Sequence, residues 1–343
     1  MTAVLLCPPG ADEATWLQAR RAGIGASEIA AVLGISPYAS PFSLYWAKAN
    51  GWEIEDTGDM EAGRRMENAI ADWAADRIDP NEQLRIVPAG LYQSAERPWQ
   101  LATPDRLIYM ACVECGGDGL LGDLDVGLSN CPACTAIGHT GDFGMGKLVA
   151  VLEVKHPYSW DGFGEDGTDE IPVYFRTQLL QQMDVMEVSE GYLAAYCGHE
   201  LRVYHLRRDD KDIVVMRAAG AAFWQRLQDG IVPDLDGHSE TIAALRKLHP
   251  SLGEGPVEVT AELAEGYRQA RADRKAADVR VKECEAQIRA ALGSTYSRAE
   301  CNGKLVASRS VFAQSEDWSE LAAIDDEWPT IDRLNPGRSA SYA

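Results

Sequence analysis

Two charged side chains interrupt an apolar strand near the middle of the chain. The stretch is residues 148–160, "LVAVLEVKHPYSW", and its charges are Glu153 and Lys155. Side chains alternate along a strand, so these two share one face while Leu152 and Val154 share the other. An isolated pair of this kind is commonly a surface ion pair. Its neighbours in the fold decide whether it does chemistry.

A third charged residue is Asp105, which lies in "ATPDRL" at the edge of an upstream strand. A hairpin between strands 101–110 and 148–155 would bring Asp105 against Glu153. Two carboxylates held close together repel each other unless a cation lies between them. Hard oxygen ligands suit Mg²⁺ or Mn²⁺, and a nearby lysine would reach the attacking water or a phosphate. The chemistry indicated is metal-assisted hydrolysis of a phosphodiester, in which the metal acts as a Lewis acid and lowers the pKa of water.

A second candidate metal site lies in residues 111–146, between these two strands. Its ligands would be four cysteines in a C-x2-C-x15-C-x2-C arrangement: Cys112, Cys115, Cys131 and Cys134. This spacing favours a tetrahedral structural Zn²⁺ site, with an iron–sulfur cluster or free thiols as the alternatives. A closed four-ligand site has no open position for chemistry, so we expect the insertion to be structural.

Hydrophobic periodicity predicts the elements that position these groups. We expect helices at 12–33, 59–77, 171–188, 218–230 and 260–292, strands at 84–94, 99–110 and 148–155, and hairpins at 191–208 and 297–311. Without a regular strand–helix alternation, this order predicts an α+β fold with a mixed central sheet flanked by helices. The expected domains are a core at 1–236 interrupted by the 111–146 zinc-knuckle insertion, a linker at 237–259, a long amphipathic C-terminal helix at 260–293, and a short hairpin with an acidic, mobile tail at 294–343.

Composition is that of a soluble globular protein, with 46% hydrophobic and 25% charged residues among 343. The 32 Lys and Arg against 53 Asp and Glu give a net charge of −21. This charge argues against a protein that coats nucleic acid by bulk electrostatics, although a local basic groove or bound metal ions would permit a DNA enzyme. We find no membrane span and no secretory leader, so a cytoplasmic location, in a bacterial host cell, is expected.

The three charged residues together resemble a known motif. "TPD" with Asp105 and "EVK" with Glu153 and Lys155 resemble the PD-(D/E)xK nucleases, and in particular the lambda-exonuclease-like, YqaJ-type viral recombinase nucleases of phages. Further fragments match that family in order between residues 16 and 236: "RRAGIGASEIAAVLGISPY", "MEAGRRMENAIADW", "DGTDEIPVYFRTQLLQQMDVM" and "FWQRLQDGIVPDLDG". The resemblance implies a restriction-endonuclease-like core. The cysteine insertion departs from the family pattern, which has a much shorter hairpin at this point.

The resemblance also assigns roles to individual residues. It implies that Mg²⁺ or Mn²⁺, two ions per site, is bound by Asp105, Glu153, Glu67 and the Val154 carbonyl. Lys155 would position or activate the water, and Gln178 would support Lys155. Gln182 is the weaker candidate for that supporting role. The alternative for Glu67 is an ordinary charge on a helix surface.

Three residues near the N-terminus match positions that the family uses near the 5′-phosphate of a DNA end: Ser27, Arg20 and Arg21. A hydroxyl with helix N-terminal amides is a physically reasonable phosphate site, and Ser27 as a plain helix N-cap is compatible with it. The resemblance implies a metal-dependent exonuclease on double-stranded DNA ends, 5′→3′, serving phage-type homologous recombination. Homo-oligomers, often ring-shaped trimers, and a single-strand annealing protein are the implied partners.

Two alternatives stay open from the sequence. One is a structure-selective or sequence-specific endonuclease of the same fold. The other is a catalytically inactive, zinc-stabilised scaffold that binds DNA or protein. The 260–292 helix is equally compatible with packing on the core and with oligomerisation.

Overall fold

The structure is a computed structural model, and the residues it describes are 3–52, 57–115, 120–123, 127–135, 145–251, 253–313 and 330–336. The chain divides into two compact units, Met1–Ser251 and Leu252–Ala343. Within the described residues, none of the helices combines the length and apolar character that a bilayer crossing requires.

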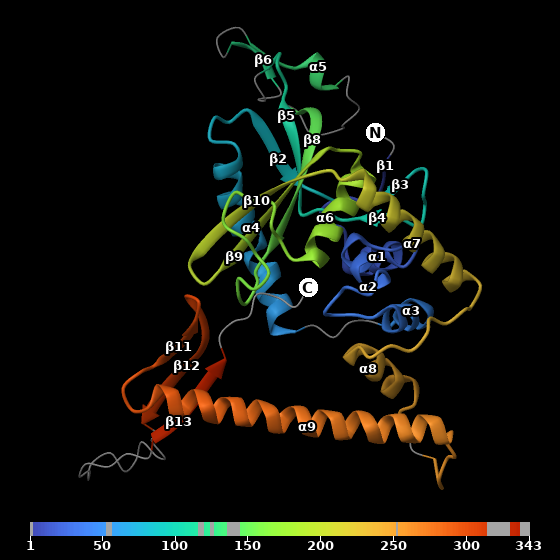
Figure 1. The fold of residues 1–343 in the computed structure, drawn as a ribbon. Helices are drawn as coiled ribbons and strands as arrows, with labels where there is room; N and C mark the ends of the chain where they lie inside the picture. Colours follow the sequence, from blue (N-terminus) through green and yellow to red (C-terminus); the bar gives the residue numbers. More distant parts are fainter. Residues whose placement is uncertain are drawn as a thin grey trace, which may run out of the picture. The chain divides into compact units, whose positions relative to one another are not determined.

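The centre of the first unit is a five-stranded sheet. Its strands are β2 (Leu84–Pro88), β5 (Arg106–Ala111), β8 (Met145–Lys155), β9 (Glu190–Cys197) and β10 (Glu200–Arg207). They lie in the order β10-β9-β8-β5-β2; β8 and β9 are parallel, and the other pairs are antiparallel. Helices α4 (Gly58–Ile78) and α6 (Val173–Met186) pack against the sheet (Figure 1). The predicted α+β class with a mixed sheet flanked by helices is confirmed.

The alternation of strand β8 separates two hydrophobic cores. Leu152 and Val154 pack with Ile70 of α4, whereas Val151 packs with Leu179 of α6. This separation follows from the period of two along a strand. Glu153 and Lys155 therefore share one face of β8, as the sequence predicted, and the structure shows that this is the face that α6 covers.

A small second sheet holds β1 (Ala3–Cys7), β3 (Leu91–Ser94) and β4 (Leu101–Ala102), in the order β1-β3-β4. The predictions of single strands at 84–94 and 99–110 were therefore wrong, because each segment is divided between the two sheets. Gly90 marks the first break: a Cβ there would lie 2.2 Å from the Cys7 carbonyl oxygen, so only glycine permits this close approach. Pro104, which has no N–H for a sheet ladder, lies at the second.

The N-terminal helical segment is also more broken than predicted. It contains α1 (Glu13–Arg20), a 3₁₀ turn at Ala26–Glu28, and α2 (Ile29–Val32), followed by α3 (Pro41–Asn50). Ser27 is not a helix N-cap, which corrects that interpretation. It lies inside the 3₁₀ turn, whose N-cap is Gly25, and the Gly25 N–H donates to the Glu28 carboxylate at 2.7 Å.

The first unit extends to Ser251, whereas the sequence predicted that the core ends at residue 236. Helix α7 (Asp210–Gln228) follows the β9–β10 hairpin, and α8 (Ser239–Leu248) lies in the segment expected to be a linker. Buried Thr241 of α8 bonds Ser40, the N-cap of α3, with 2.6 Å between the two hydroxyl oxygens. Residues 239–248 are thus packed into the first unit.

The second unit consists of α9 (Ala261–Leu292) and a three-stranded sheet of β11 (Arg298–Cys301), β12 (Lys304–Ala313) and β13 (Thr330–Pro336). The β11–β12 hairpin turns at Asn302 and Gly303, which have φ values of 51° and 75°, as the Asn-Gly pair predicts. Strand β13 corrects the expectation of a purely mobile tail, because it pairs with β12 along its length. Residues 314–329 and 337–343 of that tail lie outside the described residues.

Candidate active site

The hairpin of β5 and β8 brings the two predicted carboxylates together. Arg106 pairs with Leu152 across the ladder, so Asp105 lies beside the end of β8. Its Oδ2 accepts a hydrogen bond from the Val154 N–H at 2.7 Å. Asp105 is therefore fixed next to Glu153 by the backbone of the strand that carries Glu153.

Glu153 is buried, with 4% of its surface exposed, and three side chains donate to it. Lys155 Nζ lies 2.6 Å and Gln178 Nε2 lies 2.5 Å from Oε1. Gln182 Nε2 lies 2.6 Å from Oε2. An ionised carboxylate offers about four acceptor positions. These three bonds fix its orientation and leave acceptor capacity on Oε2.

The charges in this corner perturb one another. Burial raises the pKa of Asp105 well above its ordinary value, and the neighbouring Glu153 and Glu67 carboxylates raise it further. Burial alone would lower the pKa of Lys155, but Glu153 and Asp105 outweigh it and raise that pKa. A buried group of carboxylates that repel one another is an arrangement that a cation would stabilise.

Glu67 of α4 lies at the same corner, joined to it by Arg106. The Arg106 guanidinium donates to Glu67 Oε1 at 2.8 Å, to Asn68 Oδ1 at 2.6 Å and to the Asp105 carbonyl oxygen at 2.7 Å. Arg106 itself is only 6% exposed. Glu67 is therefore a partly buried carboxylate within the electrostatic reach of Asp105, and not an isolated charge on the helix surface.

The donor set fits a hard divalent cation. The carboxylates of Asp105 (just before β5), Glu153 (β8) and Glu67 (α4) act on one another electrostatically, and hard oxygen ligands of this type are those preferred by Mg²⁺ and Mn²⁺. Among the described residues, their oxygens do not form a group that lies within 4.8 Å of one another, as the cysteine sulfurs described below do. The backbone carbonyl of Val154 belongs to the same strand end. These are the residues that could hold such an ion.

The structure separates the two arginines predicted near a phosphate. Arg20 donates to the Ser27 hydroxyl at 2.9 Å and lies 3.6 Å from the Glu28 carboxylate. Arg21 instead donates to the Gly51 carbonyl oxygen at the end of α3, at 3.3 Å. Arg20 and Ser27 thus form one polar pair, and Arg21 does not join it.

A third glutamine of α6, Gln181, holds the segment that leads to Ser27. Gln181 Nε2 donates to the carbonyl oxygens of Ile24 and Leu101, both at 2.9 Å. Ile24 also forms an isolated parallel β-bridge with Gln100. Helix α6 consequently holds both the Glu153 corner and the segment that leads to Ser27.

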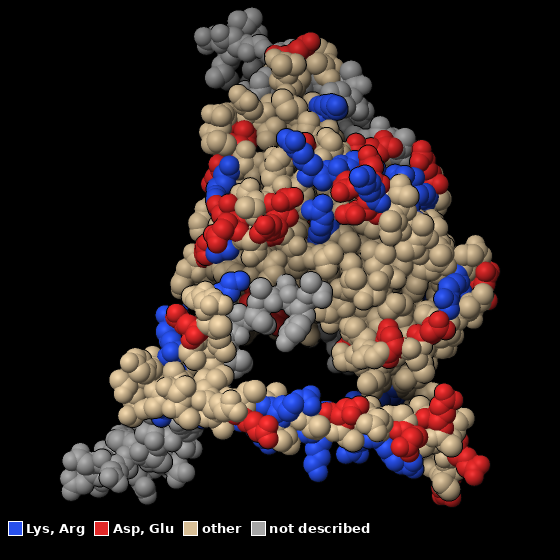
Figure 2. Space-filling view, in the orientation of Figure 1, with Lys and Arg blue, Asp and Glu red and all other residues tan. Residues whose placement is uncertain are grey.

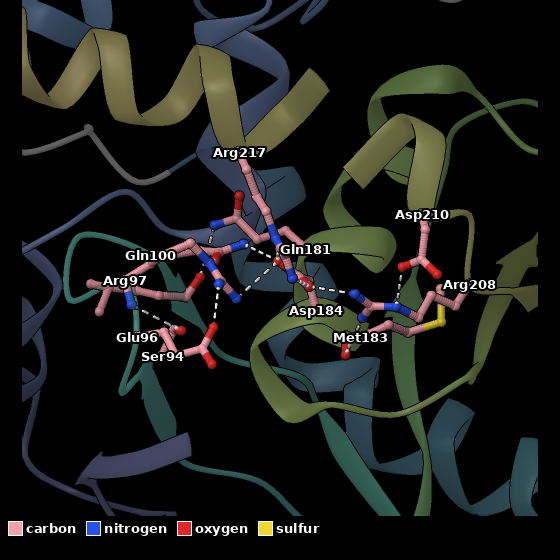
Figure 3. A network of polar contacts seen from close by, with 11 residues as sticks. Ser94, Glu96, Arg97, Gln100, Gln181, Met183, Asp184, Arg208, Asp210 and Arg217 are labelled. Atoms are coloured by element: carbon pink, nitrogen blue, oxygen red, sulfur yellow. Dashed lines mark hydrogen bonds and ion pairs between the residues drawn. The ribbon is translucent and has the colours of Figure 1, made fainter. Parts of the chain in front are cut away.

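The end of α6 is anchored by a buried carboxylate, Asp184 (Figure 3). The Asp184 side chain is 1% exposed. It accepts hydrogen bonds or ion pairs from four side chains at 2.5–3.5 Å: Arg97, Gln100, Arg208 and Arg217. These donors come from the loop before β4, from the end of β10 and from α7, so the network fixes α6 against its surroundings.

The cysteine insertion carries a thiol cluster at the far end of the β5–β8 hairpin. The described parts of this insertion contain β6 (Leu120–Asp123), β7 (Gly127–Asn130) and α5 (Pro132–Thr135). Buried Cys112, Cys115 and Cys131 have sulfur atoms within 4.8 Å of one another. Cys112 and Cys131 are 3.9 Å apart, too far for a disulfide. A tetrahedral zinc with Zn–S bonds of about 2.3 Å places its sulfurs about 3.8 Å apart, so the cluster fits zinc. The side chain of Cys134 lies outside the described residues.

Charge is interspersed on the visible face of the first unit. Figure 2 shows acidic and basic side chains lying in the same regions, without a broad area of one sign. The net charge of −21 is therefore compatible with local attraction of a phosphate only where individual basic groups converge.

Sequence reasoning missed two features of this site. Gln182 donates to Glu153 just as Gln178 does, although it was the weaker candidate. Arg106 was not singled out at all. The sequence feature that could have identified Arg106 is a positive charge directly after Asp105, at the start of an otherwise apolar strand, "DRLIYM".

Comparisons with known proteins identify a family for this chain. The YqaJ-like viral recombinase domain matches residues 15–189. An uncharacterized protein, YqaJ of Bacillus subtilis (strain 168), is 24% identical over 240 residues, covering 68% of this chain and 62% of that protein. The chain thus spans less than two thirds of the length of that relative.

Three solved structures are similar to this chain at low sequence identity. An alkaline exonuclease (LHK-Exo) from Laribacter hongkongensis has a TM-score of 0.42 and 18% identity, over 63% of this chain and 93% of that one. Its complex with dAMP has a TM-score of 0.43 at 17% identity, with the same coverage of both chains. SSO0001 has a TM-score of 0.32 at 9% identity, over 59% and 76%. The family assignment rests on the domain match.

Proposed function

The chain belongs to the YqaJ-like viral recombinase domain family, and from this premise we propose that it is a metal-dependent nuclease that hydrolyses double-stranded DNA from its ends. The observation that carries the proposal is the convergence of Asp105, Glu153 and Lys155 at one corner of the sheet. The finer form of the proposal is a 5′→3′ exonuclease that serves phage-type recombination. It would act as a homo-oligomer and pass single strands to an annealing protein.

The metal would be Mg²⁺ or Mn²⁺, bound by Asp105, Glu153, Glu67 and the Val154 carbonyl. When bound, it would supply Lewis-acid stabilisation of the charge that develops on the phosphate and would lower the pKa of water. Gln178 and Gln182 hold the Glu153 carboxylate in a single orientation for this purpose. Arg106 does the same for Glu67 through its bond to Oε1.

Lys155 would position the attacking water. Its ammonium lies 2.6 Å from Glu153 Oε1 and 5.1 Å from the centre of the Phe175 ring. These contacts restrict the long side chain to the corner where the carboxylates meet. Because its pKa is raised, Lys155 is a cation here, which suits it to hold water or a phosphate oxygen by donating hydrogen bonds.

The 5′-phosphate of the DNA end would meet Arg20 and Ser27. A guanidinium and a hydroxyl 2.9 Å apart can both donate to one phosphate, and an arginine–phosphate contact is strong because the bond is charge-assisted. Arg20 is already shared with Glu28, so the pair is held in place before a phosphate arrives. Arg21, which contacts Gly51, is assigned no part in it.

Digestion of linear duplex DNA tests the proposal. We expect the protein to release nucleotides from 5′-phosphorylated duplex in Mg²⁺, and to stop when the metal is chelated. Glu153→Gln, which keeps the shape but removes the charge, is expected to abolish digestion. Parent protein that leaves linear duplex intact in both Mg²⁺ and Mn²⁺ would overturn the proposal.

A second substrate distinguishes exonuclease from endonuclease activity. Covalently closed circular DNA has no ends, so an exonuclease leaves it intact, whereas an endonuclease nicks it. Comparing 5′-phosphate with 5′-hydroxyl ends tests the Arg20 and Ser27 assignment in the same assay. A preference for the phosphate that disappears in Arg20→Ala supports it, and equal rates on both ends contradict it.

The cysteine cluster would hold a structural Zn²⁺. Cys112, Cys115 and Cys131 would be ligands, with Cys134 as the fourth. Because the cluster lies at the end of the β5–β8 hairpin, the zinc would close the long excursion between Asp105 and Glu153. Its contribution to folding would follow from the metal binding a site that the unfolded chain lacks.

A further inference from the structure

An exposed tyrosine lies beside the catalytic corner, and none of the roles above uses it. Tyr38 is 69% exposed. Its ring meets Tyr174 edge to face, with centroids 5.7 Å apart and an interplanar angle of 88°. Tyr174 lies 4.4 Å from Phe175, the ring over which the Lys155 ammonium sits. The Tyr38 phenol is also close enough to interact electrostatically with Lys155.

The loop that carries Tyr38 is anchored on both sides. Before it, buried Ser36 accepts from the Tyr38 N–H at 3.1 Å, and its carbonyl oxygen lies 3.0 Å from His238 Nε2. After it, Ser40 is 1% exposed and bonds Thr241 at 2.6 Å. Helix α8, which starts after His238, therefore braces this loop. Tyr38 points into solvent from a rigid support, which is the arrangement of a preformed contact for a ligand.

We propose that Tyr38 stacks on a nucleobase of the DNA whose phosphate lies at the Asp105–Glu153 corner. This inference rests on the proposed nuclease function. The base of a nucleotide bound there is separated from its phosphate by one sugar ring, and the Tyr38 phenol interacts electrostatically with Lys155, so the Tyr38 ring lies within reach of that base. Every base has a π face, and stacking on an aromatic side chain tolerates any sequence.

The contacts of Tyr38 explain why this ring and not its neighbours would receive the base. The edge-to-face contact with Tyr174 covers at most one face of the Tyr38 ring. Tyr174 and Phe175 are themselves partly buried, and Phe175 packs against the apolar core. Among these three rings, Tyr38 offers the largest exposed area, and Tyr174 would hold it in position from behind.

The test combines kinetics with a fluorescent base. We expect Tyr38→Ala to lower kcat/KM on linear duplex about 5- to 150-fold, the range that stacking of one base supports. Tyr38→Phe and Tyr38→Trp keep an aromatic ring and are expected to retain activity within about threefold, which separates loss of stacking from loss of fold. Tyr267→Ala is the matched control, because Tyr267 is 64% exposed but lies on α9 in the second unit.

The direct readout is 2-aminopurine placed at the terminal position of the duplex. In a Lys155→Ala background, which keeps the DNA uncut, binding is expected to quench 2-aminopurine fluorescence, and adding Tyr38→Ala is expected to remove the quenching. Quenching that persists together with an unchanged kcat/KM overturns the role of Tyr38 while leaving the nuclease proposal intact. A parent protein that does not cleave DNA at all overturns the proposed function first, and this inference with it.

Discussion

Outside the corner formed by Asp105, Glu153 and Lys155, Asp184 is expected to be the single charge whose removal costs the most stability. Its carboxylate is 1% exposed and is bonded by Gln100 and three arginines at 2.5–3.5 Å (Figure 3). Removing one partner of a buried ion network costs about 3–5 kcal/mol. The arginine side chains here are 20–34% exposed, so water can hydrate them in part. We therefore expect Asp184→Asn to lower the free energy of unfolding by about 2–4 kcal/mol.

Urea unfolding of the first unit, followed by tryptophan fluorescence, measures this change. Glu61→Gln is the matched control, since Glu61 pairs with Arg65 on the exposed surface of α4 and its loss is expected to cost less than about 1 kcal/mol. An Asp184→Asn protein as stable as this control would refute the reasoning. It would mean that burial of the carboxylate already cancels what its hydrogen bonds contribute.

The same network has a defined pH dependence. Burial alone would raise the pKa of Asp184, but hydrogen bonds from Arg217, Gln100 and Arg208 outweigh it and hold that pKa below its usual range. A lowered pKa means that the carboxylate stabilises the fold fully above the unfolded value of about 4, and that this stability is lost as the pH falls below it. The difference in stability between parent and Asp184→Asn is therefore expected to be constant from pH 8 to about 5 and to shrink below about pH 4.

Three further predictions concern the metal sites and the packing. Purified protein is expected to release stoichiometric zinc to a chromophoric chelator, and Cys131→Ser to contain little; equal zinc in both would exclude the cluster as its site. Gln178→Leu is expected to lower metal-dependent activity about 10- to 100-fold because Glu153 loses a donor, and a parent-like rate would show that this bond is dispensable. Gly220→Ala is expected to destabilise the protein by about 1–3 kcal/mol, because the added Cβ would lie 2.4 Å from the Trp99 ring. Gly266→Ala, whose Cβ would have nothing within 4 Å, is expected to stabilise it by up to about 1 kcal/mol. Thermal melting compares the two variants, and a higher melting temperature for Gly220→Ala than for Gly266→Ala would contradict the packing.

The sequence predicted that Asp105, Glu153 and Lys155 lie close together, because the determinants of this arrangement are local. The period of two in β8 places Glu153 and Lys155 on one face, and the only long-range step is the pairing of β5 with β8. That pairing required a hairpin across a 36-residue insertion, 111–146, which the CxxC pairs made recognisable as a separate element.

The partners of Glu153 could not be read from helix periodicity in the same way. Every residue of α6 from Thr177 to Met186 is buried, so its glutamines are not on a solvent-exposed face and their partners could not be inferred from an amphipathic pattern. The choice between Gln178 and Gln182 depends on contacts with a strand some 25 residues earlier, and the structure shows that both donate to Glu153.

The remaining differences also arise from contacts that are distant in sequence. The break at Gly90 exists because the Cys7 carbonyl approaches it, more than 80 residues away. Helix α8 lies in the segment that was predicted to be a linker, and its place in the first unit depends on the bond between Thr241 and Ser40. Strand β13 follows a long acidic segment and is defined by its pairing with β12. Single-sequence patterns contain none of these pairings.

The central claim is that Asp105, Glu153 and Lys155 form one catalytic centre, and the rate of Mg²⁺-dependent digestion of 5′-phosphorylated linear duplex by Lys155→Ala tests it most directly. Lys211→Ala is the matched control, since Lys211 is an exposed lysine in the first turn of α7. We predict a loss of about 10²- to 10⁴-fold for Lys155→Ala, with correct folding shown by an unchanged circular dichroism spectrum, and no change for the control. Equal rates for the parent and both variants would contradict the assignment.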